Sequence, residues 1–414
     1  MELPFATLDV FTTKKFEGNP LAIVRVPAAL RSRLTQSMKQ KIATEFNLSE
    51  TVFLHDDTSR CGPEARDMDI FTSVREIPFA GHPTIGTAVY SRHYLPGGTA
   101  GSGSGDVDAE VKELVTKAGR IELEPLSSLP GGIQARIPHD VHLHAATFRT
   151  ILATATGDKA AKLQSGLHTT ASQAVREAEL DAPIFSIVNG MTFVLVRLSS
   201  LEELAQAKPS RLEVDELVAD FLDEGWRNSL VGRYYYVDMD GNREREDEEE
   251  GRGGSALHLR TRMMGEGIED PATGSAASAL AAYLTLTLTL TRERRAAATA
   301  AFRITQGVEM GRRSVISVET TTAAAVVEEK EKAEGGDEQQ QQQQQQQVRL
   351  VDVKLGGTAV VVMHGTITVG DVDAIRVQSI RSLTTNLKNM KCQTRPVNVD
   401  QIGLPNCHSA DILD

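Results

Sequence analysis

Residues 78–88 read Pro-Phe-Ala-Gly-His-Pro-Thr-Ile-Gly-Thr-Ala, and an apolar run from Val89 to Leu95 follows them. Proline is well tolerated in the first helical turn, so this stretch predicts a helix that begins right after His82. Residues 269–276 read Glu-Asp-Pro-Ala-Thr-Gly-Ser-Ala, and an alanine- and leucine-rich run that strongly favours helix continues to Leu284. These two helix starts decide the fold, because each follows strand-like residues and precedes an apolar helix.

The two stretches align without a gap, with His82 opposite Asp270 and Thr87 opposite Ser275, and a proline, a glycine and an alanine coincide. Such a match in the same strand-helix context indicates a duplicated α/β unit. If the copies are related by a pseudo-twofold axis, His82 and Asp270 occupy equivalent places at two helix N-termini that face one cleft. Helix N-termini carry unpaired N–H groups and partial positive charge, so this cleft suits a small carboxylate-bearing substrate.

The rest of the chain shows the same mixture of strands and helices. Alternating residues predict a β-hairpin of strands at 5–11 and 21–26, with a turn at 18–20. Apolar residues at helical spacing predict a helix between a cap at Thr35 and a stop at Asn47. Further strand-like runs are at 51–54, 68–72, 184–198, 233–239 and 257–264.

This pattern divides the chain into two halves and an extension. We expect an N-terminal half at 1–130 that holds Glu50 and His82, and a C-terminal half at 131–365 that holds Asp270 and Ser275. The extension at 366–414 has no predicted role. Inserted loops near 240–254 and 320–347, the second ending in a glutamine run, are expected outside the core, and residues 97–105 form a glycine- and serine-rich linker.

Composition excludes several classes of protein. Of 414 residues, 40% are hydrophobic, which is enough to bury one large core or two moderate ones. The three cysteines show no metal-ligand spacing and are too few for a disulfide framework, so we expect no metal. A formal net charge of -12 disfavours a nucleic-acid partner. No targeting or membrane-spanning run is evident, which predicts a cytoplasmic protein without a membrane partner.

Five motifs together resemble the phenazine-biosynthesis PhzF-like family, over approximately Pro4 to Gly365 apart from the insertions. These motifs are Asp9-Val10-Phe11-Thr12 with Gly18-Asn19-Pro20-Leu21-Ala22; Phe46-Asn47-Leu48-Ser49-Glu50-Thr51; Pro78 to Ala88; Glu269 to Ala276; and Gln306-Gly307 with Met310-Gly311-Arg312 and Ser314. Three positions depart from the family pattern, namely Ser73, Met263-Met264 and Arg313.

The resemblance implies a diaminopimelate-epimerase-like α/β (α+β) fold of two pseudo-symmetric halves, each a curved sheet around a central helix. It implies a cofactor-free isomerase in which Glu50 is the catalytic acid/base and His82 and Asp270 assist proton transfer. Substrate binding is expected from four further residues, namely Asn19, Gly81, Gly274 and Ser275, the glycines by allowing close backbone approach. The expected substrate is a small carboxylate-bearing molecule, and the expected assembly is a homodimer.

Each of these side chains also has an ordinary structural interpretation. Glu50 alone suggests a solvated carboxylate, a lone histidine such as His82 is usually structural, Asp270 before a proline suits a helix cap, and Ser275 suits a packed helix face. A proton-shift enzyme instead needs a group that removes and returns a proton, and partial desolvation of Glu50 would raise its pKa into the working range.

Two other functions remain open on the same fold. An amino-acid epimerase or racemase typically opposes two thiols, but His82 and Asp270 stand at those positions and no cysteine lies in either motif. A binding or scaffold protein with weak catalysis is the other alternative. The glutamine run and the long C-terminal extension favour added protein contacts, whereas the intact Glu50, His82 and Asp270 favour an enzyme.

Overall fold

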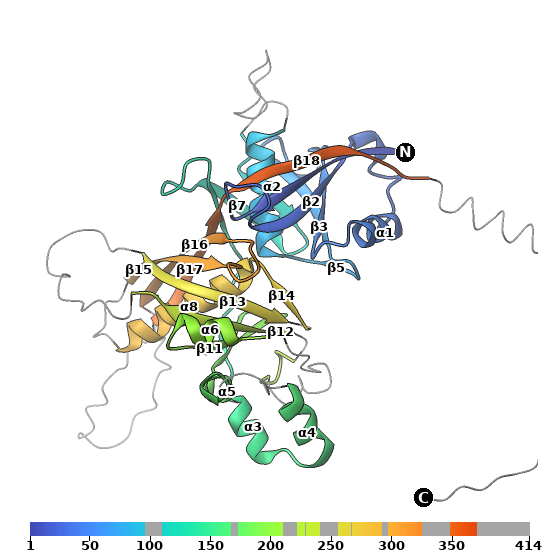
Figure 1. Ribbon diagram of the computed structural model, residues 1–414. Helices are drawn as coiled ribbons and strands as arrows, with labels where there is room; N and C mark the ends of the chain where they lie inside the picture. Colours follow the sequence, from blue (N-terminus) through green and yellow to red (C-terminus); the bar gives the residue numbers. More distant parts are fainter. Residues whose placement is uncertain are drawn as a thin grey trace, which may run out of the picture. The chain divides into compact units, whose positions relative to one another are not determined.

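The first two strands form the predicted hairpin in the computed structural model (Figure 1), which describes residues 1–95, 110–166, 173–209, 222–227, 229–240, 256–265, 267–291, 297–324 and 348–370. Strand β1 (Glu2–Val10) pairs antiparallel with β2 (Asn19–Val26). The predicted linker at 97–105, almost all of the acidic loop at 240–254, the glutamine run and most of the C-terminal extension lie outside the described residues.

Helix α1 (Gln36–Phe46) has the ends that the sequence predicts. The Thr35 hydroxyl accepts a hydrogen bond from the Met38 N–H, and Asn47 ends the helix in the left-handed conformation with φ of 49°. Asparagine adopts this conformation more readily than most residues, so it stops a helix well. Both predictions are confirmed.

Six further strands extend the sheet from the hairpin. Parallel pairing joins β2 to β3, and antiparallel pairing joins β3 to β4 and β4 to β5. The sheet then continues through β6, β7 and β8. The bounds are 3₁₀-helix η1 (Ala28–Leu30), β3 (Thr51–His55), β4 (Ala65–Phe71), β5 (Glu76–Ile77), β6 (Glu113–Thr116), β7 (Gly119–Pro125) and β8 (Ile133–Arg136).

The later strands continue the sheet from β8, which pairs with β17. The predicted strand run at 184–198 is a hairpin, because Gly190 with φ of 97° turns the chain between β10 and β11. Strand β18 pairs with β1, so the end of this sheet returns to the first strand. The bounds are β9 (His142–Leu143), β10 (Ile184–Val188), β11 (Met191–Arg197), β12 (Leu230–Asp238), β13 (Leu257–Gly265), β14 (Ile268–Asp270), β15 (Ala297–Gln306), β16 (Ser314–Ala324), β17 (Val348–Gly357) and β18 (Ala359–Thr368).

Two central helices carry the apolar packing. In α2 (Gly81–His93) every residue from Gly81 to Ser91 is buried, and the helix packs on β1, β2, β3, β8 and β17. Helix α8 (Gly274–Thr291) packs on β10, β11, β15, β16 and β17. A helix that is buried on all sides needs small residues where strands approach closely, which explains the alanine-rich first turns of α8.

The strands around α8 are covered on both faces. Along β11, Phe193 and Leu195 join the main apolar cluster, whereas Val194 and Val196 join a second cluster. This alternation follows from the period of two along a strand. Four helices contribute to the second cluster, namely α3 (Phe148–Thr154), α4 (Gly157–Gly166), α5 (Gln173–Asp181) and α6 (Leu201–Gln206).

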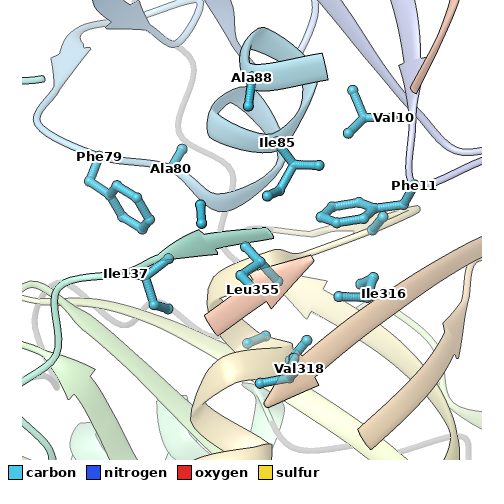
Figure 2. Packing of buried hydrophobic residues seen from close by; sticks show 14 of the residues in the cluster. Val10, Phe11, Phe79, Ala80, Ile85, Ala88, Ile137, Ile316, Val318 and Leu355 are labelled. Carbon is cyan, nitrogen blue, oxygen red and sulfur yellow. The ribbon is translucent and has the colours of Figure 1, made fainter. Parts of the chain in front are cut away.

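The main cluster joins residues from both halves of the sequence. Figure 2 shows Phe11 beside the end of β1, Ile85 on α2 and Leu355 on β17 packed within it. Residues from Glu2 to Ile367 form one compact unit. The expected boundary between two halves at residue 130 therefore stays a prediction.

Two expected segments begin later than the sequence suggested. Residues 320–324 were expected in an inserted loop, but they belong to β16, where Thr320 and Thr322 are fully buried. Their alternating burial shows why threonine-rich sequence without an apolar period still forms a strand inside a sheet. Residues 366–368 likewise end β18 rather than start an extension.

In its described part, the second unit comprises Met1 and residues 368–370. Within its described part, the Met1 amino group donates a hydrogen bond to the Val369 carbonyl at 2.7 Å. Among the described helices of the whole chain, none combines the length and the apolar character needed to span a membrane.

Candidate functional site

The starts of the two central helices touch each other at Gly81 and Gly274. A Cβ atom added to Gly81 would lie 2.9 Å from the Gly274 Cα and 3.0 Å from the Ser275 nitrogen. A Cβ atom added to Gly274 would lie 3.2 Å from the Gly81 Cα. The close backbone approach expected of these glycines is therefore an approach of one helix N-terminus to the other.

The register of the internal repeat differs from the expected alignment. Helix α2 begins at Gly81, within two residues of the expected start, whereas α8 begins only at Gly274. The second helical residues are therefore His82 and Ser275, and Asp270 lies four residues before the helix. The expectation that His82 and Asp270 occupy equivalent places is wrong.

A strand explains this shift. Asp270 ends β14 and pairs with Met263 of β13, so its backbone is still extended. The carbonyl of Thr273 accepts the first helical hydrogen bond, from the Ala277 N–H at 3.0 Å. Thr273 rather than Asp270 therefore stands at the cap position, and the capping interpretation of Asp270 is also wrong.

Glu50 and His82 form the first part of the site. Glu50 directly precedes β3, and its Oε2 lies 3.6 Å from the Nδ1 of His82, the second residue of α2. The Glu50 side chain is 18% exposed, but its Oε2 is inaccessible and, like the buried His82 Nε2, has no hydrogen-bond partner among the described residues. A buried polar atom without a partner is costly, so these two atoms are candidates for contact with a ligand.

Burial shifts the pKa values of both groups. Desolvation raises the pKa of the Glu50 carboxyl to about 7, against a smaller opposite effect from a hydrogen bond with Ser49. Desolvation lowers the pKa of the His82 imidazole to about 4, against a smaller opposite effect from the nearby Asp270. At neutral pH, Glu50 is therefore close to half-ionised and His82 is neutral.

Asp270 forms the second part of the site and is held by hydrogen bonds. Its Oδ1 accepts from the Asn19 Nδ2 at 2.8 Å, and its Oδ2 accepts from the Thr273 hydroxyl. Asn19 also donates to the Ala272 carbonyl at 2.8 Å, which ties the start of β2 to the segment before α8. Desolvation raises the pKa of Asp270 to about 6, and the nearby His82 opposes this rise.

Gln306 supports Asp270 from behind and was not assigned to the site from sequence. Its Nε2 donates to the Asp270 carbonyl at 2.8 Å, and its Oε1 accepts from the Thr273 N–H at 3.2 Å and from the Tyr234 hydroxyl at 3.0 Å. Gln306 is fully buried at the end of β15. The only sequence signal for it was its place in the last of the five motifs.

The same motif clamps the loop that carries Asn19. The Arg312 guanidinium donates to the Asp9 carboxylate at 2.6 Å and to the Gly18 carbonyl at 2.8 Å. The Ser314 hydroxyl donates to the Pro271 carbonyl at 3.1 Å. Arg312 and Ser314 thus fix the two segments that Asn19 bridges, a role that sequence alone did not reveal.

The structure brings together the candidates Asn19, Glu50, His82 and Asp270, and it places Gly81, Gly274 and Ser275 at the two helix starts beside them. Whether these residues bind substrate stays a prediction. One group of described residues has ligand atoms close enough together for a metal ion, and it lies elsewhere, at His142, His144 and Asp223.

Comparison with known proteins supports the resemblance across the chain. The family model described as "Phenazine biosynthesis-like protein" matches residues 8–365. A protein of Pasteurella multocida named as an uncharacterized isomerase is 48% identical over 90 residues, which are 21% of this chain and 29% of that protein. The trans-2,3-dihydro-3-hydroxyanthranilate isomerase of Pseudomonas chlororaphis is 39% identical over 85 residues, 20% of this chain and 28% of that protein. The matches thus span less than a third of these relatives.

Solved structures show the fold. A phenazine biosynthesis protein of the PhzF family from Bacillus anthracis aligns with a TM-score of 0.54 at 18% identity, over 89% of this chain and 100% of the other. A predicted epimerase from Pseudomonas aeruginosa aligns with a TM-score of 0.54 at 19% identity and the same coverage. The chain has the expected mixed α/β, diaminopimelate-epimerase-like fold.

Proposed function

We propose that this chain, which belongs to the phenazine biosynthesis-like protein family, is an isomerase that moves a proton on a small carboxylate-bearing substrate. Isomerases among the relatives support the reaction class, although each match covers only part of the relative. The site geometry supports the roles of individual residues.

The observation that carries the proposal is the environment of Glu50. General acid–base catalysis is most effective when the pKa of the catalytic group lies near the working pH. Burial raises the pKa of Glu50 to about 7, and its Oε2 has no hydrogen-bond partner among the described residues. An ordinary solvated glutamate has neither property.

The proposed reaction begins with proton transfer from a substrate carbon to the Glu50 carboxylate. The electron pair left by the broken C–H bond moves into the substrate π system, and the proton returns from Glu50 to another carbon. His82 is neutral, since burial lowers its pKa to about 4, and it acts as a hydrogen-bonding group rather than a cation. Asp270 orients the amino or hydroxyl group of the substrate.

The substrate carboxylate is proposed to bind at the paired helix starts. The first turn of α2 contains no acidic residue, and the N–H groups at the starts of α2 and α8 supply donors and partial positive charge. Asn19 and Ser275 would add side-chain hydrogen bonds, and the contact of Gly81 with Gly274 keeps both helix starts at one place.

The test is solvent deuterium incorporation. Purified protein is incubated in heavy water with trans-2,3-dihydro-3-hydroxyanthranilate and with a panel of amino-acid carboxylates, and products are analysed by mass spectrometry and NMR. We expect isomerised, deuterated product from the wild type and about 10³-fold slower formation of it by Glu50→Gln. Glu45→Gln, an exposed glutamate on α1, is the matched control and is expected to behave as wild type. A wild-type rate in Glu50→Gln would contradict the mechanism.

A second candidate, epimerisation, is favoured by one observation. Glu50 and Asp270 are two carboxyl groups with raised pKa values, and the charge of Glu50 contributes to the rise at Asp270. Two such groups on opposite sides of a carbon would serve as acid and base. Chiral chromatography of the same reactions separates the candidates, because epimerisation inverts a centre and leaves double bonds in place.

Assembly and location are proposed on the resemblance alone. A homodimer is expected, and light scattering after size-exclusion chromatography measures it directly. A cytoplasmic location is expected as well, and fractionation of cells that express the chain tests it.

A further inference from the structure

A cluster of two histidines and one aspartate lies outside the proposed active site. The Nε2 of His142 lies 2.7 Å from the Asp223 Oδ2, and the Nδ1 of His144 lies 3.9 Å from the same oxygen. The three ligand atoms lie within 4.8 Å of one another. Tetrahedral zinc with bonds near 2.0–2.1 Å places its ligand atoms roughly 3.3 Å apart, so small side-chain shifts would suffice for binding.

Hydrogen bonds orient His144 for this role. Its Nε2 lies 2.9 Å from the Ser186 hydroxyl, and its Nδ1 accepts the Asp223 N–H at 3.1 Å. This pairing places the ring proton on Nε2 and the lone pair on Nδ1, the nitrogen that faces Asp223. Metal-binding histidines usually have such a second partner for the other ring nitrogen.

The Ser186 hydroxyl that contacts His144 is itself held by hydrogen bonds. The Ser186 hydroxyl lies 2.6 Å from the Thr192 hydroxyl, which lies 2.7 Å from the Ser229 hydroxyl. Ser186 and Thr192 are on the adjacent strands β10 and β11 and are fully buried. The orientation of His144 is therefore fixed by the sheet rather than by a surface loop.

His142 is open to solvent on one side and stacked on the other. Its side chain is 32% exposed, that of Asp223 is 36% exposed, and His144 is buried below them. Trp226 stacks on His142 with ring centres 4.9 Å apart and planes at 11°. The Trp226 N–H bonds to the Asp223 carbonyl at 3.0 Å, so one turn presents both residues to His142.

We propose that His142, His144 and Asp223 bind one divalent transition-metal ion, zinc by the nature of the donors. Two imidazole nitrogens and one carboxylate oxygen form a common three-ligand zinc set, and solvent supplies the fourth ligand. The ion would replace the proton shared by His142 and Asp223 and the hydrogen bond between the Asp223 N–H and His144. It would tie residues 222–227 to β9 and β10. From the sequence we expected no metal, on the basis of cysteine spacing. The chain carries no sequence signal for this cluster, because Asp223 is 79 positions from His144.

The chain contains a single tryptophan, so its fluorescence reports on this cluster. Full-length, tag-free protein is treated with EDTA, dialysed and titrated with Ni²⁺, which quenches a nearby indole, and then with Zn²⁺ as a competitor. We expect saturable quenching, reversal by zinc, and one zinc per chain with a Kd of roughly 1 µM or tighter.

Variants separate this cluster from adventitious binding. His142→Gln and Asp223→Asn each remove one ligand at a partly exposed position, and we expect each to weaken zinc binding at least tenfold, as ligand changes do. His364→Gln, an exposed histidine on β18, is the matched control with unchanged affinity. Absence of saturable quenching in the wild type, or equal zinc affinity in the wild type and both ligand variants, would overturn the proposal. Circular dichroism of each metal-free variant confirms that it is folded.

Discussion

Glu50 and Asp270 are both carboxyl groups whose pKa values are raised by burial, but they differ in how they are held. Both oxygens of Asp270 accept hydrogen bonds, from Asn19 and Thr273. The Oε2 of Glu50 has no hydrogen-bond partner among the described residues. A carboxyl group with both oxygens bound is well suited to hold an orientation, whereas one with a free oxygen is suited to exchange a proton. We therefore expect Asp270 to position the substrate and Glu50 to transfer the proton.

The largest expected effect separates the two carboxyl groups directly. Glu50→Gln is expected to lower kcat about 10³-fold, because it removes the proposed acid/base. Asp270→Asn keeps the side-chain shape and is expected to lower kcat only about tenfold, mainly through altered hydrogen bonds. Steady-state kinetics on the substrate found by deuterium exchange measures both. Equal losses in the two variants would remove the proposed division of roles.

The second effect concerns stability and pH. The folded-state pKa of Glu50, about 7, lies above its ordinary value of 4.5, so between these pH values the unfolded chain binds fewer protons than the folded chain. The contribution of Glu50 to the free energy of unfolding is therefore greatest below pH 4.5. It falls by about 3 kcal/mol in total as the pH rises to 7. Urea unfolding of wild type and Glu50→Gln at pH 4.5, 6 and 7.5 should show their difference changing by that amount. A constant difference would indicate an ordinary pKa for Glu50.

A smaller effect is expected when the two helix starts are forced apart. Gly81→Ala places a Cβ atom 2.9 Å from the Gly274 Cα, which can move only with its helix. We expect a loss of about 1–3 kcal/mol in unfolding free energy and a wider separation of His82 from Asp270. The control is Gly265→Ala, where the nearest atom is the flexible Met263 Cε at 3.8 Å, with an expected change within about 0.5 kcal/mol. Similar urea midpoints for both variants would argue against tight helix contact.

The smallest expected effect concerns the hydrogen bonds of Asp270. Thr273→Val keeps the side-chain shape but removes the hydroxyl that donates to Asp270, and it should lower stability by about 1–2 kcal/mol. Thr87→Val is the contrasting control, because the buried Thr87 hydroxyl has no partner among the described residues. That change should be neutral or stabilising. Thermal unfolding of both variants checks the prediction, and an equal loss in both would indicate a packing effect alone.

Sequence predicted the local elements well where the cause is local. The cap at Thr35, the stop at Asn47 and the first hairpin follow from one or a few residues. The motifs also predicted that Glu50, His82 and Asp270 lie close together. The internal repeat gave a register wrong by five residues, because matching prolines concealed the short strand β14 that delays the second helix.

The missing parts of the site depend on contacts between distant segments. Gln306 supports Asp270 only because β15 ends beside the segment that leads into α8, and Arg312 reaches Asp9 across 303 positions of sequence. Side-chain type and spacing do not encode such proximity. The cluster of His142, His144 and Asp223 could not be predicted for the same reason, because only the two histidines are close in sequence.

The pairing of β18 with β1 has a consequence for synthesis of the chain. Strand β1 leaves the ribosome well before β18, so one of its edges has no partner until residues 359–368 have been made. At about 5–20 residues per second this interval lasts on the order of tens of seconds. During it, an apolar strand that contains Leu8 and Val10 presents open backbone groups, the condition under which strands associate between chains. Messages truncated before Ala359 will therefore yield aggregation-prone products, and the nascent chain is a natural client for chaperones.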